Sequence, residues 1–234
     1  MALLSMKRET PILLDRALTM TRHLMIQDYR DSEHGNYRTN PKRKCGLFEH
    51  AYGQSFSMTD RDVLIDEAQT CIKNFFQSEI FATAREIGTD KWLFIDQKSI
   101  GSQSGIENFC LEGTTIFASP DFVFLNEKDE LELVDWKMGK VSNTLSIQMV
   151  CYTLYAMDKW PIPIDKIRVT EYGLQENQLF SHIPNTEEII EGKKRIKDSI
   201  DEMMALLRDK RNNVAEMDDF PPTQNPQICK WCNF

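Results

Sequence analysis

Residues 119–137, SPDFVFLNEKDELELVDWK, contain two apolar runs that are separated by a polar turn, and this pattern predicts an antiparallel β-hairpin. If the hairpin folds about a centre near Lys128, the numbers of two residues that face each other sum to 256. Asp121 then lies opposite Asp135, with roughly 5 Å between the Cβ atoms. Two carboxylates at that distance repel each other unless a cation separates them. The hairpin therefore predicts a site for a hard divalent ion such as Mg²⁺ or Mn²⁺.

Lys137 belongs to the same predicted site. Side chains at positions i and i+2 of a strand point to the same face, so Asp135 and Lys137 are neighbours, while Trp136 turns away. The carbonyl oxygen of Trp136 is a further candidate metal ligand. The ammonium group of Lys137 would orient an attacking water molecule, lower its pKa, or neutralise charge on a phosphate. This combination of residues is suited to phosphodiester cleavage.

Each aspartate alone is also compatible with an ordinary residue at a solvated strand end. Both, however, adjoin apolar runs: Val134 and Trp136 flank Asp135, and residues 122–124 follow Asp121. A charge in such surroundings is costly unless it has a function. The pair therefore favours the functional interpretation.

The chain outside the hairpin contains further helical and strand patterns. Helical periodicity covers residues 12–30, 60–86, 142–159 and 186–209, and strand patterns cover residues 91–96, 116–125, 130–137, 167–174 and 179–184. This order predicts a mixed α/β (α+β) fold with a central mixed β-sheet flanked by helices. We expect one domain over residues 1–234, with an N-terminal helical part (1–88), a catalytic core (89–184) and a C-terminal helix with a cysteine pair (185–234). A fragment that lacks both ends is the alternative.

Gln148 and Tyr152 lie four residues apart on the predicted helix 142–159. Positions i and i+4 share one face of a helix, so both side chains would reach a phosphate or a base near the ion. Taken alone, this spacing is also typical of one surface residue and one core residue.

The composition is ordinary for a soluble globular protein, with 41% hydrophobic and 27% charged residues. No apolar run approaches the roughly 20 residues that span a bilayer, and no signal-peptide pattern opens the chain. We therefore expect a cytoplasmic protein without a membrane partner. The net charge of -8 argues against a protein that coats nucleic acid with its whole surface, but it leaves room for a local basic groove. The basic clusters at 42–44 and 193–197 are interpreted first as solvated surface.

Three motifs resemble those of the PD-(D/E)XK nuclease superfamily, and within it the RecB-like branch, which includes CRISPR-associated exonucleases and the nuclease domains of helicase–nuclease complexes. They are Pro120-Asp121, Asp135-Trp136-Lys137-x-Gly139 and Gln148-x-x-x-Tyr152. The resemblance runs from about residue 47 to the C-terminus. It implies a restriction-endonuclease-like core.

The resemblance also implies roles for these residues. Asp121 and Asp135 would bind one or two Mg²⁺ or Mn²⁺ ions, Lys137 would act on the attacking water, and Gln148 and Tyr152 would position the substrate. The implied activity is hydrolysis of DNA, as an exonuclease or on single strands or duplex ends, in repair, recombination or defence. A helicase or another subunit of a complex is the implied protein partner.

Many members of this branch have a histidine metal ligand in a Gly-x-x-x-His pattern on an upstream helix. The segment from Gly46 to His50 fits that pattern, so His50 is a candidate metal ligand. Two alternatives remain open. His50 is a structural or surface histidine, or the ligand helix precedes residue 1.

Many relatives also hold an iron–sulfur cluster with one N-terminal cysteine and three cysteines near the C-terminus. Cys229-x-x-Cys232 resembles the start of that C-terminal group, and Cys45 is a candidate third ligand. A cluster usually needs four thiolates, and a fourth is not obvious. The alternatives are a truncated chain, a lost cluster, a remnant pair, or a zinc site, which also requires four ligands.

Two other functions are compatible with these motifs. One is a non-catalytic module that binds nucleic acid or serves as a scaffold within a larger helicase–nuclease complex. The other is an RNA endonuclease with the same core. The intact set of Asp121, Asp135 and Lys137 favours catalysis, because binding alone does not need two carboxylates that face a phosphate.

Overall fold

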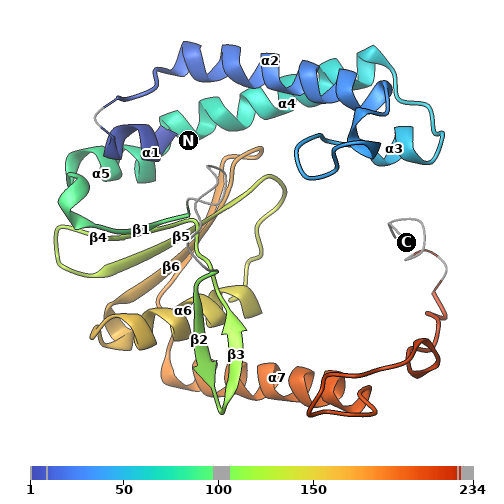
Figure 1. The fold of residues 1–234 in the computed structure, drawn as a ribbon. Coiled ribbons are helices and arrows are strands. Elements are labelled where there is room, and N and C mark those ends of the chain that lie inside the picture. Colours follow the sequence, from blue (N-terminus) through green and yellow to red (C-terminus); the bar gives the residue numbers. More distant parts are fainter. Residues whose placement is uncertain (1, 9, 97–105, 226, 228–234) are drawn as a thin grey trace. The chain divides into compact units, whose positions relative to one another are not determined.

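The structure is a computed structural model that describes residues 2–8, 10–96, 106–225 and 227. Contacts between residues divide the chain into two compact units, residues 1–186 and 187–234 (Figure 1). The boundary falls close to the expected start of the C-terminal part at residue 185, while the single-domain organisation stays a prediction.

The first unit begins with helices and continues into strands. Its helices are α1 (Ala2–Lys7), α2 (Leu14–Glu33), η1 (Asn36–Arg38), α3 (Phe48–Ala51), α4 (Met58–Gln77), α5 (Glu79–Glu86), η2 (Thr89–Lys91), α6 (Ile147–Lys159) and η4 (Ile164–Lys166). Its strands are β1 (Trp92–Ile95), β2 (Asn108–Leu111), β3 (Thr114–Phe117), β4 (Phe122–Leu125), β5 (Leu131–Lys137), β6 (Ile167–Gly173) and β7 (Gln178–His182).

Five of these strands form a mixed sheet in the order β1-β4-β5-β6-β7. The pairs β1–β4, β4–β5 and β6–β7 are antiparallel, whereas β5–β6 is parallel. The parallel pair requires a crossover, which α6 supplies. The predicted mixed sheet with flanking helices is confirmed.

The predicted hairpin register is also confirmed. Phe122 pairs with Val134 and Leu125 pairs with Leu131, so opposed residues sum to 256 throughout the β4–β5 ladder. Asn126 makes the turn because its side-chain Oδ1 accepts hydrogen bonds from the backbone N–H groups of Lys128 and Glu130. Turn chemistry of this kind fixes the register of both strands.

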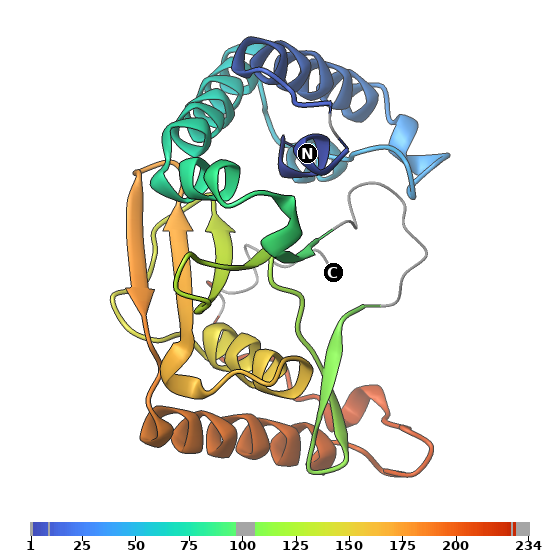
Figure 2. The same ribbon diagram turned by 90° about the vertical axis from the view of Figure 1, so that its left-hand side faces the viewer.

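The two faces of the sheet are covered by different helices, as Figures 1 and 2 show for α1 and α5 on one side and α6 on the other. Val134 packs in a buried cluster with Leu3, Phe81 and Trp92 on the first side. Residues of β5 alternate between faces, so Asp135 and Lys137 point to the α6 side. The functional groups of the hairpin are thus separated from the main aromatic core.

The helix predicted over residues 60–86 is wrong in one respect, because it is two helices, α4 and α5, with a break at Ser78. The Ser78 backbone is extended, with a ψ of 145°, and its hydroxyl accepts a hydrogen bond from the Phe81 N–H. The same hydroxyl donates to the Phe75 carbonyl, so one side chain ends α4 and begins α5. The N-cap of α4 is Ser57, which forms a capping box with Asp60.

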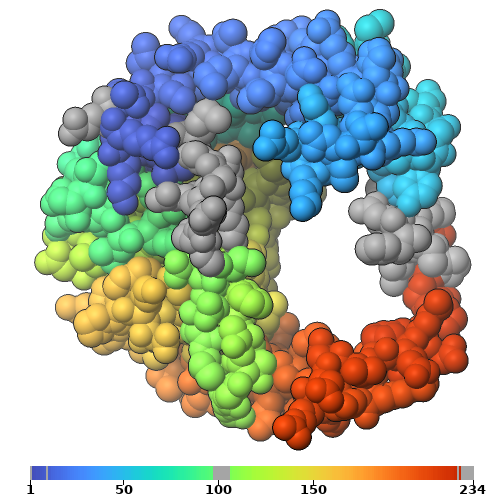
Figure 3. Space-filling view, in the orientation of Figure 1, coloured from blue at the N-terminus to red at the C-terminus, as the bar shows by residue number. Residues whose placement is uncertain are grey.

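The predicted strand 116–125 is likewise two strands. β3 pairs with β2 in a separate two-stranded sheet, and residues 118–121 separate β3 from β4. The β2–β3 turn contains Glu112 and Gly113, both with positive φ, which is typical of a tight hairpin. This hairpin contacts α6, and Figure 3 shows the two side by side on one face. β2 was not predicted.

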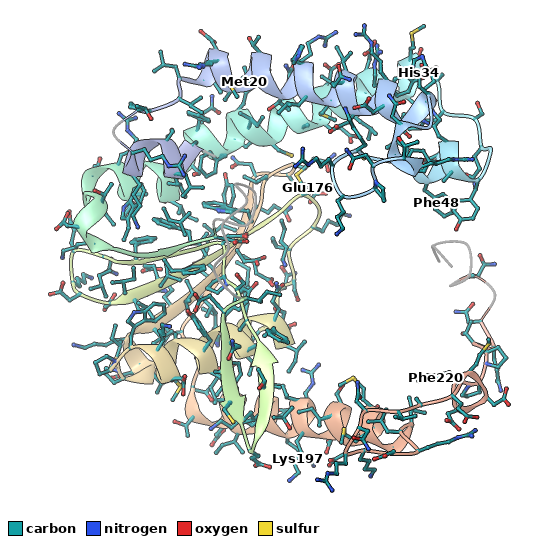
Figure 4. All side chains as sticks on the ribbon, in the orientation of Figure 1. Met20, His34, Phe48, Glu176, Lys197 and Phe220 are labelled. Atoms are coloured by element: carbon teal, nitrogen blue, oxygen red, sulfur yellow. The ribbon has the colours of Figure 1, made fainter. Side chains whose placement is uncertain are left out.

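The helical patterns at 12–30 and 142–159 correspond to α2 and α6, with ends that differ by a few residues, and α1 was not predicted. α2 and α4 pack against each other, and Gln69 of α4 donates a hydrogen bond to the Leu18 carbonyl. Figure 4 labels Met20 in the first half of α2 and His34 at its C-terminal end.

The second unit contains most of α7 (Thr186–Ala205), a turn that is closed by a bridge between Asp209 and Val214, and η5 (Met217–Asp219). Arg208 forms ion pairs with Glu216 and Asp219. Within the described residues of both units, no helix combines the length and the apolar character needed to cross a membrane.

Candidate active site

Asp121 and Asp135 lie at the end of the β4–β5 ladder. The last paired residues are Phe122 and Val134, so the next opposed positions are these two aspartates. Asp121 Oδ2 accepts a hydrogen bond of 2.7 Å from the backbone N–H of Trp136. This bond holds the Asp121 carboxylate against the backbone of β5, directly beside Asp135.

Asp96 extends the acidic row to a third strand. Ile95 pairs with Phe122, and the Asp96 N–H donates a 2.9 Å hydrogen bond to the Asp121 carbonyl. Burial raises the pKa of Asp121 to about 6. The Trp136 N–H and Lys137 oppose this rise, whereas the charges of Asp135 and Asp96 add to it. The Asp121 carboxylate is therefore poorly compensated by the protein alone.

Asp135 is the most enclosed acid of the hairpin, with 4% of its surface exposed. Its Oδ1 lies 3.3 Å from Gln148 Nε2 and 3.2 Å from the Tyr152 hydroxyl. Its Oδ2 lies 2.6 Å from Lys137 Nζ, an ion pair outside hydrogen-bond geometry. Two side chains of α6 thus hold Oδ1 by hydrogen bonds, whereas Oδ2 contacts the ammonium group of Lys137.

Gln148 connects the two charged groups of β5. Its Nε2 donates to Asp135 and to the Tyr152 hydroxyl, while its Oε1 accepts a hydrogen bond from Lys137 Nζ. The family resemblance implied that Gln148 positions the substrate. In the structure its polar atoms hold Asp135 and Lys137, and the substrate role stays a prediction.

Tyr152 lies one helical turn after Gln148 and is buried. Its hydroxyl is 3.0 Å from the Ser119 carbonyl and 3.2 Å from Asp135 Oδ1, so it can donate to either. Burial and the charge of Asp135 both raise the pKa of the Tyr152 hydroxyl. It therefore acts as a neutral donor that ties α6 to the segment that precedes Asp121.

A cavity of about 610 Å³ adjoins these residues in the first unit. Its walls are mostly apolar and include Met20 of α2, which Figure 4 labels, and Phe75 and Trp136. Asp96 and Asp121 line it as well. Asp121 therefore lines this cavity and also lies opposite Asp135 at the end of the hairpin.

His50 has a different environment. Its Nδ1 lies 2.8 Å from the Ser32 hydroxyl, and its ring packs edge-on against Tyr29. Over residues 2–8, 10–96, 106–225 and 227, no three or more His, Cys, Asp or Glu side chains are grouped closely enough to hold a metal ion. The structure thus brings Asp121, Asp135 and Lys137 together but does not add His50 to them.

The roles of Cys45, Cys229 and Cys232 as cluster or zinc ligands stay predictions. Cys229 and Cys232 lie outside the described residues, and Cys45 is an exposed free thiol. The backbone N–H of Trp136 contacts Asp121, whereas the role of the Trp136 carbonyl as a ligand stays a prediction.

Sequence reasoning missed three residues of this site. Asp96 ends the predicted strand 91–96, and register pairing with Asp121 was the signal available for it. Glu171, the register partner of Asp135 in the β5–β6 ladder, is a charge inside the apolar strand pattern 167–174, the same signal that singled out Asp135. Ser119 offers no signal in the sequence, because its contact with Tyr152 depends on the packing of α6.

The donor set fits a divalent cation. Two buried side-chain oxygen atoms lack a hydrogen-bond partner among the described residues, and both belong to this site: Ser119 Oγ and Asp135 Oδ2. Carboxylates are the ligands that Mg²⁺ and Mn²⁺ prefer. Mg²⁺ is commonly held by one or two carboxylates, with water and phosphate oxygens as the other ligands. Asp121 and Asp135 meet that requirement.

A mixed sheet with helices on both faces, and with two aspartates and a lysine at the end of its central hairpin, is an arrangement suited to phosphodiester hydrolysis. The sequence profile described as the PD-(D/E)XK nuclease superfamily matches residues 23–234, and the chain belongs to that superfamily. No curated protein matches the chain. Members of the superfamily hydrolyse phosphodiester bonds with divalent metal ions, usually Mg²⁺ or Mn²⁺. The assignment to the RecB-like branch stays a prediction.

Proposed function

We propose that this protein is a Mg²⁺- or Mn²⁺-dependent deoxyribonuclease that acts on single-stranded DNA or on duplex ends. Membership of the nuclease superfamily supports phosphodiester hydrolysis and nucleic-acid binding. The choice of DNA and of strand ends rests on the resemblance of the Gln148-x-x-x-Tyr152 motif to the RecB-like branch. A helicase or another subunit of a complex is the protein partner we propose.

The observation that carries the proposal is the state of Asp135. Its Oδ2 is buried without a hydrogen bond among the described residues, and it contacts the ammonium of Lys137, while Asp121 occupies the opposed position on β4. An unsatisfied buried carboxylate oxygen is costly in a purely structural role. A cation shared with Asp121 would remove that cost.

Each residue has a distinct part in the proposed reaction. Asp121 and Asp135 would hold the ion, with the Trp136 carbonyl as a further candidate. The ion, when bound, would activate a water molecule and neutralise charge on the phosphate. Lys137 would direct its ammonium to the attacking water or to a phosphate oxygen, since Gln148 fixes its orientation. Tyr152 would keep Asp135 in place. His50, whose Nδ1 contacts the Ser32 hydroxyl, stays a candidate ligand.

Cleavage of labelled nucleic acids tests the proposal. The full chain is incubated with single-stranded DNA, duplex DNA and RNA of one sequence, each labelled at the 5′ or the 3′ end, with Mg²⁺, Mn²⁺ or EDTA. We expect cleavage of DNA with either metal, no cleavage with EDTA, and no cleavage by Asp135→Asn. The products separate the two modes, because mononucleotides indicate an exonuclease and internal fragments an endonuclease.

Two outcomes contradict the proposal. Binding of DNA without cleavage under all metal conditions would identify a non-catalytic module. Cleavage of RNA alone would identify an RNA endonuclease.

A further inference from the structure

We propose that Glu171 is a positioning residue of the active site, acting through Ser146 on the first turn of α6. The predicted effect of Glu171 on catalysis rests on the proposed nuclease function. The contacts of Glu171 and Ser146 do not depend on that function.

Glu171 lies in the row of acids that crosses the sheet. In the parallel β5–β6 ladder Glu171 is the register partner of Asp135, and paired residues of neighbouring strands point to the same face. Asp96, Asp121, Asp135 and Glu171 thus occupy one level of four adjacent strands. Glu171 is 3% exposed, as enclosed as Asp135 itself.

The Glu171 carboxylate has a defined hydrogen-bond donor. Its Oε1 accepts a 2.8 Å hydrogen bond from the Ser146 hydroxyl. No lysine or arginine among the described residues forms a salt bridge with it. A buried acid without a cation is less stable than an apolar residue at the same place. The presence of Glu171 in a central strand is therefore explained better by a function in the site than by a contribution to stability.

Ser146 transmits this contact to α6. It is the N-cap residue of the helix, and its hydroxyl oxygen accepts a hydrogen bond from the Met149 N–H. Because one hydroxyl both donates to Glu171 and accepts from the helix, the first turn of α6 is fixed to β6. Gln148 is the second residue of that turn.

The fixed turn sets the position of Gln148, and Gln148 sets the position of the reacting groups. Its amide reaches both Asp135 and Lys137, which lie on β5. Loss of the Glu171 acceptor would release the capped first turn from β6, and loss of the Ser146 hydroxyl would also leave N–H groups of that turn unsatisfied. The Gln148 side chain would then leave Asp135 and Lys137 without their common partner.

Three variants and one control separate this role from a general structural one. Ser146→Ala and Glu171→Leu each remove the hydrogen bond, whereas Glu171→Gln keeps an Oε1 acceptor and removes the charge. The control is Glu132→Gln on β5, a partly buried acid that pairs with Arg168 and Asn126 away from α6.

Two measurements are made on each variant. The first is the NMR signal of the Gln148 side-chain amide, which needs neither metal nor activity. The second is kcat and KM for DNA at saturating Mn²⁺. We expect Ser146→Ala and Glu171→Leu to shift or broaden the Gln148 signal and to lower kcat by about 10–100-fold, the usual effect of losing a partner of a metal ligand, with little change in KM. Glu171→Gln and Glu132→Gln should retain the wild-type Gln148 signal and the wild-type kcat.

The results distinguish the two proposals. An unchanged Gln148 signal in Ser146→Ala would overturn the positioning role, even if Glu171→Leu fails to fold. Equal damage in Glu171→Gln and Glu171→Leu would also overturn it, because the hydrogen-bond acceptor would then not be the property that matters. A shifted Gln148 signal in Ser146→Ala and Glu171→Leu, together with no cleavage by the wild-type chain, would refute the nuclease function and leave the positioning role in place.

Discussion

The backbone N–H of Trp136 donates a 2.7 Å hydrogen bond to Asp121 Oδ2 and so binds the acid of one strand to the backbone of the next. Trp136 therefore serves the site through its backbone, while its side chain packs against Phe75 on the opposite face of the sheet. Trp136 thus connects Asp121, through its backbone N–H, to the aromatic core, through its ring.

The first prediction concerns Lys137. Lys137→Ala should lower kcat by about 10²–10³-fold, the range found when one donor that stabilises transition-state charge is removed. Because the alanine also leaves buried Asp135 without its cation, some loss of stability will accompany it. Lys137→Arg keeps a cation beside Asp135 but replaces a single ammonium by a planar guanidinium. It should therefore preserve the melting temperature and still lose most activity, and full activity in Lys137→Arg would contradict the assigned role.

The second prediction concerns the Tyr152 hydroxyl. Tyr152→Phe keeps the ring but removes the donor shared by Ser119 and Asp135, so the free energy of unfolding should fall by about 1–3 kcal/mol. Cleavage should fall as well, because Asp135 loses one of its two hydrogen-bond donors from α6. Denaturant unfolding and cleavage rates measure the two effects.

Tyr155→Phe is the matched control for that variant. Tyr155 lies on the same helix and donates a hydrogen bond to Glu107 rather than to a site residue. Its loss should reduce stability and leave cleavage unchanged. Similar losses of cleavage in both variants would indicate a general effect on α6.

The third prediction concerns the pKa of Asp121. In the metal-free protein this pKa is about 6, above the ordinary value of 3.8, so the folded state binds the proton more tightly than the unfolded state does. The stability that comes from the protonated form is fully present below pH 3.8 and is lost as the pH rises through about 6. Asp121→Asn should remove this loss and be more stable at pH 7 by on the order of 2 kcal/mol.

Unfolding by denaturant in EDTA from pH 3.5 to 8 measures this difference. The stability curves of wild type and Asp121→Asn should diverge between pH 4 and pH 7, while Glu127→Gln, in the exposed β4–β5 turn, should follow wild type. Parallel stability curves for wild type and Asp121→Asn would contradict the prediction, because they would mean that folding does not raise the pKa of Asp121.

The fourth prediction concerns the break between α4 and α5. Ser78→Ala removes both hydrogen bonds of the hydroxyl, and loss of an N-cap costs about 1 kcal/mol. The melting temperature should fall by about 2–4 °C, with cleavage unchanged. Ser57→Ala, at the exposed cap of α4, should have a smaller effect. Calorimetry of both variants provides the comparison.

Much of the hairpin could be predicted from the sequence, because a local turn determines which residues face each other. Asn126 and the four residues after it fix the register, and the register alone brings Asp121 to Asp135. The mixed sheet followed from the order of the helical and strand patterns. The break at Ser78 did not, because apolar residues continue at helical spacing on both sides of it.

Contacts between distant segments could not be predicted. The position of His50 depends on how α2 and α3 pack, and its Ser32 and Tyr29 neighbours carry no signal of that packing. The role of Gln148 as a bridge within the site depends on the crossover that lays α6 over β5 and β6. Glu171 could have been recognised by the argument applied to Asp135, since both are charges within apolar strands.

The length of the four-residue turn at 126–129 determines which residues of β4 and β5 face each other in the site. Adding or deleting one residue there would slide β4 past β5 by one position and turn Asp121 toward the opposite face, since strand side chains alternate. Such a change would leave every acid and the lysine intact and would still dismantle the pocket. Length variation in this turn is therefore a more sensitive indicator of lost activity among similar chains than substitution on the surface around it.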